Sequence, residues 1–188
     1  NQTLMLVISQ SGETIDTLGA LMEAKSRGAQ IISICNVRES TIDRKSDYTM
    51  YTDAGPEIGV ASTKAFISQL IIMYKLAFHL AGKEFNVRGT EIESKIKEVL
   101  SKHEEIKTLA QKYYLYQNFL YIGRNRNFPL ALEGALKLKE ISYIHAEAYP
   151  AGELKHGPIA LVSEEMPTVA ICPRDSVYAK TFSNIEEI

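Results

Sequence analysis

The chain has 188 residues, 45% of them apolar, and its 21 Lys and Arg residues nearly balance its 23 Asp and Glu residues. A chain of this length can bury a sizeable core, and the balanced charge disfavours a nucleic-acid-binding surface or an acidic tail. The longest apolar run, residues 65–81, is interrupted by Ser68, Gln69, Lys75 and His79, so it favours a buried or interface helix over a membrane span.

The cysteines and the first residues indicate the cellular compartment in which the protein functions. Cys35 and Cys172 each end a predicted strand, which is typical of buried thiols in a reducing compartment, and nothing in the sequence supports a disulfide between them. No secretory signal is visible at Asn1, so we expect a cytoplasmic protein. Because the chain opens directly into a strand without an initiator methionine, we expect it to be a piece of a longer protein.

The first part of the chain alternates strands and helices. Predicted strands span residues 3–9, 30–35 and 48–51, and a predicted amphipathic helix spans residues 15–25. The run over residues 3–9 is continuously apolar, which is the pattern of a buried parallel strand. Residues 38–46 are predicted to form a polar loop. Strand–helix–strand units of this length indicate a parallel α/β sheet.

Two long helices are predicted in the middle of the chain. The first, over residues 63–81, is apolar and follows a loop of small residues. The second, over residues 90–114, is strongly charged and is the expected connector between two lobes. Its apolar seam consists of Ile92, Ile96, Val99, Ile106, Ala110 and Tyr113. We expect His103, on this seam, to be a half-buried packing residue rather than a ligand.

The last part of the chain repeats the order of strands and helices predicted for the first part. Strands are predicted over residues 118–123 and 166–173, and helices over residues 131–144 and 176–188. The order strand, polar break, helix over residues 166–181 resembles that over residues 3–17, which suggests two lobes of one fold in tandem. We expect a first lobe at 1–82, a connecting charged helix within 83–116 and a second lobe at 117–188.

Residues 9–14, with the sequence SQSGET, lie between a predicted strand and a predicted helix and are called the hydroxyl loop below. Ligands of parallel sheets bind at the carboxyl ends of strands, where free N–H groups of the following helix attract phosphate. The loop lacks the glycine spacing of ATP and dinucleotide motifs. The alternative is a helix cap made by Ser11 or Thr14, and Glu13 or Asp16 would repel a phosphate if it pointed inward.

A second candidate site is a charged face on the predicted helix over residues 131–144. Glu133, Lys137 and Glu140 are spaced four and then three residues apart, which stacks them on one side of the helix. An irregular segment with several titratable groups is predicted to follow: His145, Glu147, Glu153, Lys155 and His156. Such a cluster suits acid–base chemistry. From spacing alone, a solvated row of weak ion pairs is the better explanation of the charged face.

Four strings carry a resemblance to a known family: SQSGET at 9–14, EIGVASTKAF at 57–66, KLKEISYIHAE at 137–147 and AGELKHGP at 151–158. Over essentially its whole length, the chain resembles the isomerase region of the glucosamine-6-phosphate synthase family, the glutamine–fructose-6-phosphate transaminases. The resemblance implies two tandem sugar isomerase (SIS) lobes, each a three-layer parallel α/β sheet flanked by helices, assembled as a homodimer. Both lobes would be truncated here, with the first lacking its first strand.

The resemblance also implies roles for individual residues. Those that would bind fructose 6-phosphate are Ser9, Gln10, Ser11 and Thr14, which would hold the phosphate, and Val60, which would contact the sugar. Glu140 would be the base that moves a proton between C1 and C2, with Glu133 and Lys137 in the same site. His156 would help to open the sugar ring and would serve the site of the partner subunit. No metal or cofactor is implied.

Parts of the family pattern are missing from this sequence. These are the N-terminal glutaminase domain with its cysteine nucleophile, a serine before Thr3, and a C-terminal lysine that forms a Schiff base with the sugar. We therefore expect the parent chain to supply the glutaminase domain, and this piece alone to be inactive. The expected parent reaction converts fructose 6-phosphate and glutamine to glucosamine 6-phosphate and glutamate. The alternatives are another SIS phosphosugar isomerase or deglycase, and a non-catalytic sugar-phosphate sensor that tolerates loss of Glu140.

Overall fold

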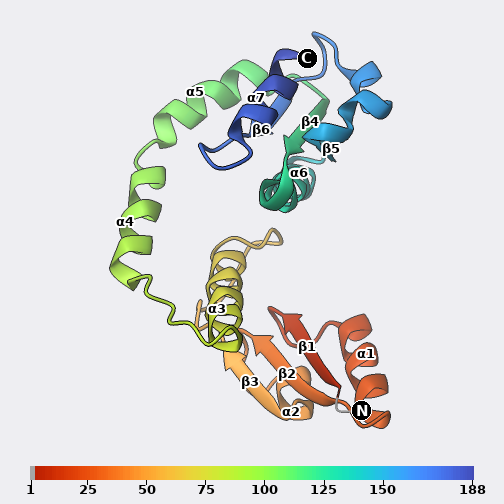
Figure 1. Cartoon of the computed structure of the whole chain (residues 1–188), viewed down its shortest axis with the longest axis vertical. Coiled ribbons are helices and arrows are strands. Elements are labelled where there is room, and N and C mark those ends of the chain that lie inside the picture. Colours follow the sequence, from red (N-terminus) through yellow and green to blue (C-terminus); the bar gives the residue numbers. More distant parts are fainter. Residues whose placement is uncertain (1–2) are drawn as a thin grey trace. The chain divides into compact units, whose positions relative to one another are not determined.

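The computed structural model of the chain describes residues 3–188. It divides into two compact units, Asn1–Val87 and Arg88–Ile188. Each unit contains a three-stranded sheet in which every pair of neighbouring strands is parallel, and helices flank each sheet (Figure 1). The predicted α/β class with parallel sheets is therefore confirmed.

The first unit begins with the sheet that carries the hydroxyl loop. Its strands, in spatial order, are β1 (Leu4–Ser9), β2 (Gln30–Cys35) and β3 (Tyr48–Tyr51). Its helices are α1 (Ile15–Ser26), α2 (Thr41–Lys45) and α3 (Lys64–Leu80). The predicted strands and the two predicted helices are confirmed to within one or two residues at their ends. The predicted loop over 38–46 is wrong in one respect, because it contains the short helix α2.

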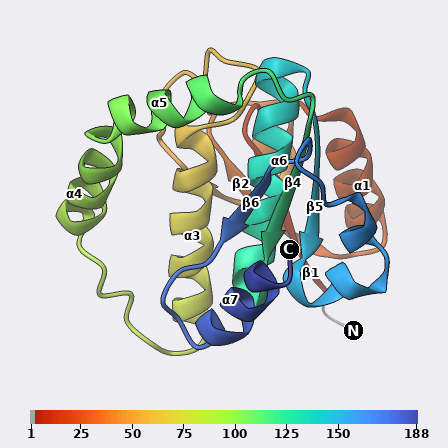
Figure 2. The same ribbon diagram turned by 90° about the horizontal axis from the view of Figure 1, so that it is seen from above.

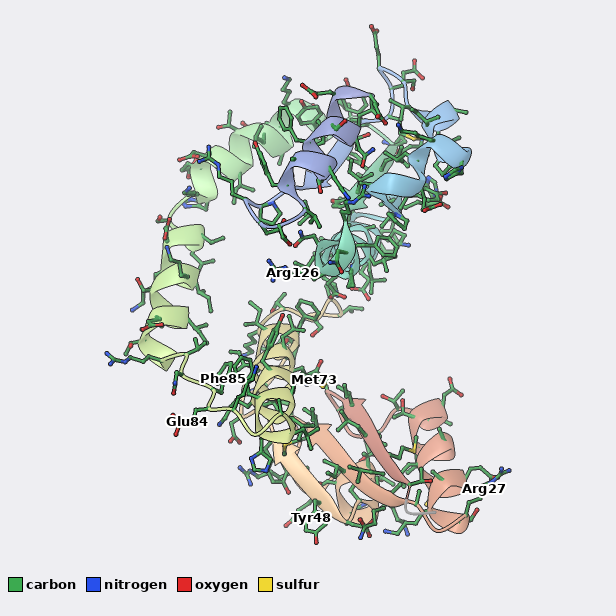
Figure 3. All side chains as sticks on the ribbon, in the orientation of Figure 1. Arg27, Tyr48, Met73, Glu84, Phe85 and Arg126 are labelled. Carbon is green, nitrogen blue, oxygen red and sulfur yellow. The ribbon has the colours of Figure 1, made fainter. Side chains whose placement is uncertain are left out.

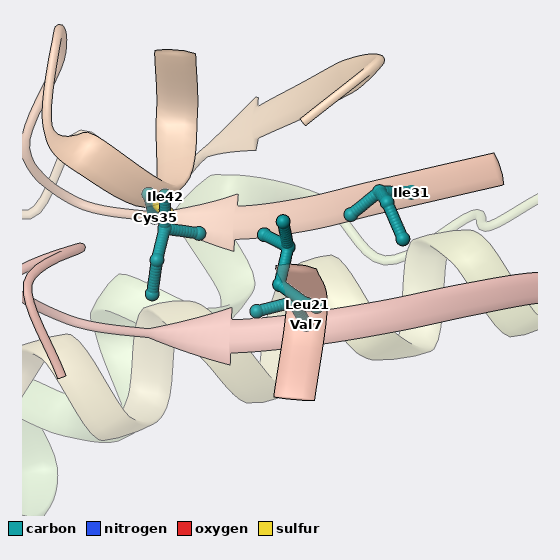
Figure 4. Close-up of a cluster of buried hydrophobic side chains, with 5 residues drawn as sticks. All are labelled: Val7, Leu21, Ile31, Cys35 and Ile42. Carbon is teal, nitrogen blue, oxygen red and sulfur yellow. The ribbon is translucent and has the colours of Figure 1, made fainter. Parts of the chain in front are cut away.

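One face of this sheet forms the core of the first unit. Its buried side chains are Val7, Leu21, Ile31, Cys35 and Ile42, from two strands and from the helices α1 and α2 (Figure 4). Burial raises the pKa of the Cys35 thiol, in agreement with a structural cysteine. On the other face of β1, Leu4, Leu6 and Ile8 are exposed. The expected burial of β1 on both faces is thus wrong, because the described residues leave this face of β1 uncovered.

The second unit is built around the central strand of its sheet. Its elements are α4 (Gly89–Leu100), α5 (His103–Tyr113), β4 (Asn118–Gly123), α6 (Phe128–Ser142), β5 (His145–Pro150), β6 (Thr168–Ile171) and α7 (Tyr178–Glu186), with three 3-10 segments, η1 (Asn125–Asn127), η2 (Ala151–His156) and η3 (Pro158–Leu161). The strand order is β5-β4-β6, and α6 lies along β4 and β5 (Figures 1 and 2). A Cβ on Gly134 would lie 2.9 Å from the Tyr121 ring, so a glycine there lets α6 approach β4 closely.

The charged region over residues 90–114 differs from its prediction. It forms two helices, α4 and α5, rather than one. His103 is the first residue of α5, and its side chain is 71% exposed and lies 2.8 Å from a Glu104 carboxylate oxygen. The prediction of a half-buried packing histidine is therefore wrong. Its seam neighbours Val99 and Ile106 are also exposed among the described residues.

Two further expectations about the second unit need correction. Residues 145–150 form β5, a regular strand paired with β4, and not an irregular segment. Cys172 is a free thiol that is only half-buried, so full burial holds for Cys35 alone. Across residues 3–188, every helix is too short or too polar to cross a bilayer.

Candidate functional site

The hydroxyl loop at the carboxyl end of β1 folds around the side chain of Ser9. The Ser9 Oγ accepts a hydrogen bond of 2.9 Å from the Gly12 N–H and lies 3.0 Å from the Thr14 Oγ1. The Ser11 Oγ accepts a longer bond of 3.2 Å from the Glu13 N–H. Ser9 itself is buried, whereas Thr14 is exposed at the mouth of the loop. The structure thus brings the Ser9 and Thr14 hydroxyls together, with Ser9 underneath, whereas Ser11 bonds only to the loop backbone.

Gly12 joins the loop to α2. Its φ of +70° lies in the left-handed region, and an added Cβ would overlap the Oγ and Cβ atoms of Ser40. Its carbonyl oxygen accepts a hydrogen bond of 2.9 Å from the Ile42 N–H. The glycine therefore lets the loop and α2 pack against each other without space for a side chain.

The two acids of the loop region are engaged elsewhere or exposed. A Glu13 carboxylate oxygen accepts a hydrogen bond of 2.7 Å from the Thr41 N–H at the start of α2, and this bond lowers the pKa of Glu13. Asp16 is exposed in the first turn of α1. Thr14 stands at the N-cap of α1 but makes no side-chain cap hydrogen bond there. The loop is therefore not the helix cap considered from the sequence, and the first N–H groups of α1 keep their donor capacity.

A cavity of about 440 Å³ opens beside the loop, at the carboxyl ends of the strands of the first sheet. It is lined by Gln10, Asn36, Val37, Gly55, Pro56 and Glu57. Asn36 fixes one wall, since its Oδ1 accepts hydrogen bonds from the Thr52 hydroxyl at 2.8 Å and from the Ala54 N–H at 2.9 Å. Its Nδ2 donates to the Gly55 carbonyl at 2.8 Å. This is the edge of a parallel sheet at which ligands bind.

No role was expected for Asn36 or Glu57 from the sequence, although both line this cavity. Asn36 directly follows an apolar strand, and a polar residue at that place is a signal that could have found it. Glu57 bonds to Thr63 and Ala65 at the start of α3, at 2.8 Å to the Thr63 hydroxyl and 3.0 Å to the Ala65 N–H. These hydrogen bonds lower the pKa of Glu57, and the bond from the Ala65 amide has the largest effect. Val60, three residues on, is almost fully exposed.

The charged face on α6 has the geometry that its spacing predicted. The Lys137 Nζ lies 2.6 Å from a Glu140 oxygen and 3.4 Å from a Glu133 oxygen. All three side chains are 23–28% exposed, so they form a half-buried network and not a fully solvated row. Burial alone would lower the pKa of Lys137, but the hydrogen bond to Glu140 and the charge of Glu133 outweigh it and the pKa is raised. Lys137 therefore stays a cation between two carboxyl groups.

The remaining titratable residues separate into two groups. Glu147 on β5 accepts a hydrogen bond from the Tyr149 hydroxyl, which lowers the pKa of Glu147, and lies 3.4 Å from the His145 ring. His156 ends η2, is 73% exposed, and lies 3.8 Å from a Glu153 oxygen. Gly157 follows with a φ of +141°, which ends the 3-10 segment. The expected single cluster is thus divided between a strand and a 3-10 segment.

Comparison with known proteins identifies the family. Residues 1–80 and 115–183 match the family model described as the SIS domain. The chain belongs to the SIS domain family. The hydroxyl loop and the cavity lie within the first matched stretch of the SIS domain, and the charged face lies within the second. This confirms the family expected from the four sequence strings.

Two curated relatives that match nearly the whole chain share one name. The glutamine–fructose-6-phosphate aminotransferase (isomerizing) of Chlorobaculum tepidum is 54% identical over 98% of this chain and 32% of its own length. Its namesake from Aquifex aeolicus is 52% identical over 100% of this chain and 32% of its own length. The solved C-terminal domain of glucosamine-fructose-6-phosphate aminotransferase from Francisella tularensis has a TM-score of 0.87 and 44% identity, over 98% of this chain and 55% of that one. The chain spans about a third of the length of the curated relatives it matches.

Proposed function

We propose that this chain is the sugar-isomerising part of a glutamine–fructose-6-phosphate aminotransferase. The observation that carries the proposal is the half-buried charged face on α6, in a chain that is 54% identical to an enzyme of that name. A row of solvated ion pairs would leave these side chains exposed, whereas here all three are only 23–28% exposed. The parent reaction converts fructose 6-phosphate and glutamine into glucosamine 6-phosphate and glutamate.

The hydroxyl loop is the proposed phosphate site. The uncapped first turn of α1 offers N–H donors and the positive end of a helix dipole. The Thr14 hydroxyl stands at the mouth, Ser9 and Ser11 shape the loop beneath it, and Gln10 lines the adjoining cavity. The hydrogen bond from Thr41 holds Glu13, which removes one source of repulsion for a phosphate. Val60 is proposed to contact the sugar.

Glu140 is the proposed base. Converting a ketose into an aldose requires a proton to be taken from C1 and returned to C2, next to a carbonyl or an imine, and one carboxylate can do both. The Lys137 ammonium holds this carboxylate at 2.6 Å, and Glu133 completes the network on the other side of the lysine. His156 is the proposed group for ring opening, because imidazoles exchange protons near neutral pH. In this proposal, His156 serves the second subunit of a homodimer, and a glutaminase domain of the parent chain supplies ammonia.

Product formation by the complete enzyme tests this assignment. The variant Glu140→Gln should form glucosamine 6-phosphate at a rate lower by roughly a hundredfold or more, because it lacks the base, while its affinity for fructose 6-phosphate stays near that of the wild type. The matched control is Glu164→Gln, which removes the charge of an exposed carboxylate in the same unit and should change neither quantity. Binding of the sugar phosphate by a wild type that forms no product would instead favour the sensor alternative.

A further inference from the structure

The segment between β3 and α3 is fixed at both ends by polar side chains. Asn36 holds its first part through the three bonds to residues 52, 54 and 55 described above. Glu57 ties the last part of this segment to the first turn of α3. Residues 57–65, which include that first part of α3, are called the clamped segment here. Because both anchors also line the cavity beside the hydroxyl loop, the position of the clamped segment is tied to the cavity wall.

Both carboxylate oxygens of Glu57 are used in the clamp. The Oε1 atom accepts from the Thr63 hydroxyl at 2.8 Å, and the Oε2 atom accepts from the N–H groups of Ala65 at 3.0 Å and Thr63 at 3.3 Å. Thr63 is the N-cap of α3 but makes no side-chain cap bond of its own, so the cap comes from a residue six positions earlier. A carboxylate at this helix end is favoured by the helix dipole as well. An amide has only one acceptor oxygen and cannot reproduce the clamp.

The clamped segment presents two apolar side chains to solvent. Ile58 is 96% exposed and Val60 is 92% exposed, whereas Ala61 between them and the helix is buried. The buried Ala61 and the two hydrogen bonds from Thr63 to Glu57 hold the segment in place. The backbone between Glu57 and Thr63 therefore fixes the direction in which Val60 projects. Val60 lies three residues after Glu57, which lines the cavity, and its exposed side chain is available for contact with a ligand.

We propose that Glu57 is a positioning residue, which fixes the clamped segment so that Val60 meets the sugar part of a phosphosugar held at the hydroxyl loop. The inference rests on the proposed function, since it takes fructose 6-phosphate as the ligand. Glu57 touches no reacting atom in this arrangement. It acts through the backbone of residues 58–62, and its loss should therefore disturb recognition of the sugar and leave recognition of the phosphate intact.

The test compares two ligands on the complete enzyme. In Glu57→Ala, the KM for fructose 6-phosphate should rise roughly tenfold or more, in line with the loss of hydrogen bonds to a charged group. The inhibition constant of inorganic phosphate, which probes the hydroxyl loop alone, should stay within about twofold of the wild type. Glu57→Gln keeps one acceptor oxygen, so its KM for fructose 6-phosphate should lie between the KM of the wild type and that of Glu57→Ala. Thr63→Val removes only the hydroxyl bond, and adding it to Glu57→Ala should cause little further loss, because the two changes break the same contact.

The matched control is Glu23→Ala. Glu23 forms an exposed ion pair of 2.6 Å with Arg27, which projects from the end of α1 (Figure 3), so its removal should leave both constants unchanged. The inference is overturned if Glu57→Ala behaves like Glu23→Ala, or if it weakens inorganic phosphate as much as fructose 6-phosphate. The second result would assign Glu57 to the general stability of the unit. A wild type that neither binds nor turns over fructose 6-phosphate would refute the proposed function instead, so the two failures are distinct.

Discussion

Replacing Gly12 by alanine perturbs the hydroxyl loop at the point where it has no room. The new Cβ would lie well inside 3.0 Å of the Ser40 Oγ and Cβ atoms, on a residue with a φ of +70°. A left-handed backbone costs an L-residue about 1–2 kcal/mol, and overpacking a buried contact costs about 1–3 kcal/mol. We therefore expect Gly12→Ala to lower the free energy of unfolding by about 2–5 kcal/mol, and to weaken phosphate binding because the loop must move.

Two comparisons separate these contributions. Gly19→Ala on α1 is the matched control, since a Cβ there has no other atom of residues 3–188 within 4 Å, and it should be neutral or stabilising by up to about 1 kcal/mol. Adding Ser40→Gly to Gly12→Ala should recover the overpacking part and leave the backbone strain. Thermal and denaturant unfolding of the complete enzyme, with inorganic phosphate inhibition measured in parallel, gives both quantities. Equal stabilities for Gly12→Ala and Gly19→Ala would refute the packing argument.

Two more predictions concern the hydroxyl loop and the second unit. Thr14→Val should weaken fructose 6-phosphate binding by about 1.5–3 kcal/mol and hardly affect the binding of unphosphorylated fructose. Equal effects on both sugars in calorimetry would show that the loop does not bind the phosphate. Hydrogen bonds from Asn127 and the Val177 N–H, together with Arg126, lower the pKa of Asp175 from 3.8. Its contribution to stability is thus present above the unfolded pKa and lost as the pH falls through the folded value, so acid unfolding below about pH 4 should be shallower in Asp175→Asn. An unchanged acid profile in this variant would contradict that role.

Most of the strands were predictable because their apolar runs have the length and the borders of buried parallel strands. Residues 3–9, 30–35 and 118–123 each end in a polar or glycine break, and each forms a strand. The short helix α2 escaped prediction because a five-residue helix with a single apolar residue, Ile42, is too short to show helical periodicity. The strand β5 was missed although its sequence alternates, with Ala146 buried between His145 and Glu147. That period of two was visible in the sequence and was outweighed by the density of titratable residues.

The candidate site was only partly predictable, for a related reason. The charged face on α6 follows from helical spacing, which fixes which residues meet. The clamp of Glu57 on Thr63 and Ala65 follows no local spacing rule, because a loop conformation brings the carboxylate back to a helix six residues later. The division of the 90–114 region into α4 and α5 has no glycine or proline to announce it.

Hydrogen exchange at C1 of fructose 6-phosphate tests the central claim most directly, since it reports the proton transfer of the isomerase step without the transfer of ammonia. The complete enzyme should exchange the C1 hydrogen of the substrate with deuterated water, as followed by NMR. Glu140→Gln should bind the sugar phosphate and exchange at a rate lower by roughly a hundredfold or more. Exchange in Glu140→Gln at nearly the wild-type rate would contradict the assignment of Glu140 as the base.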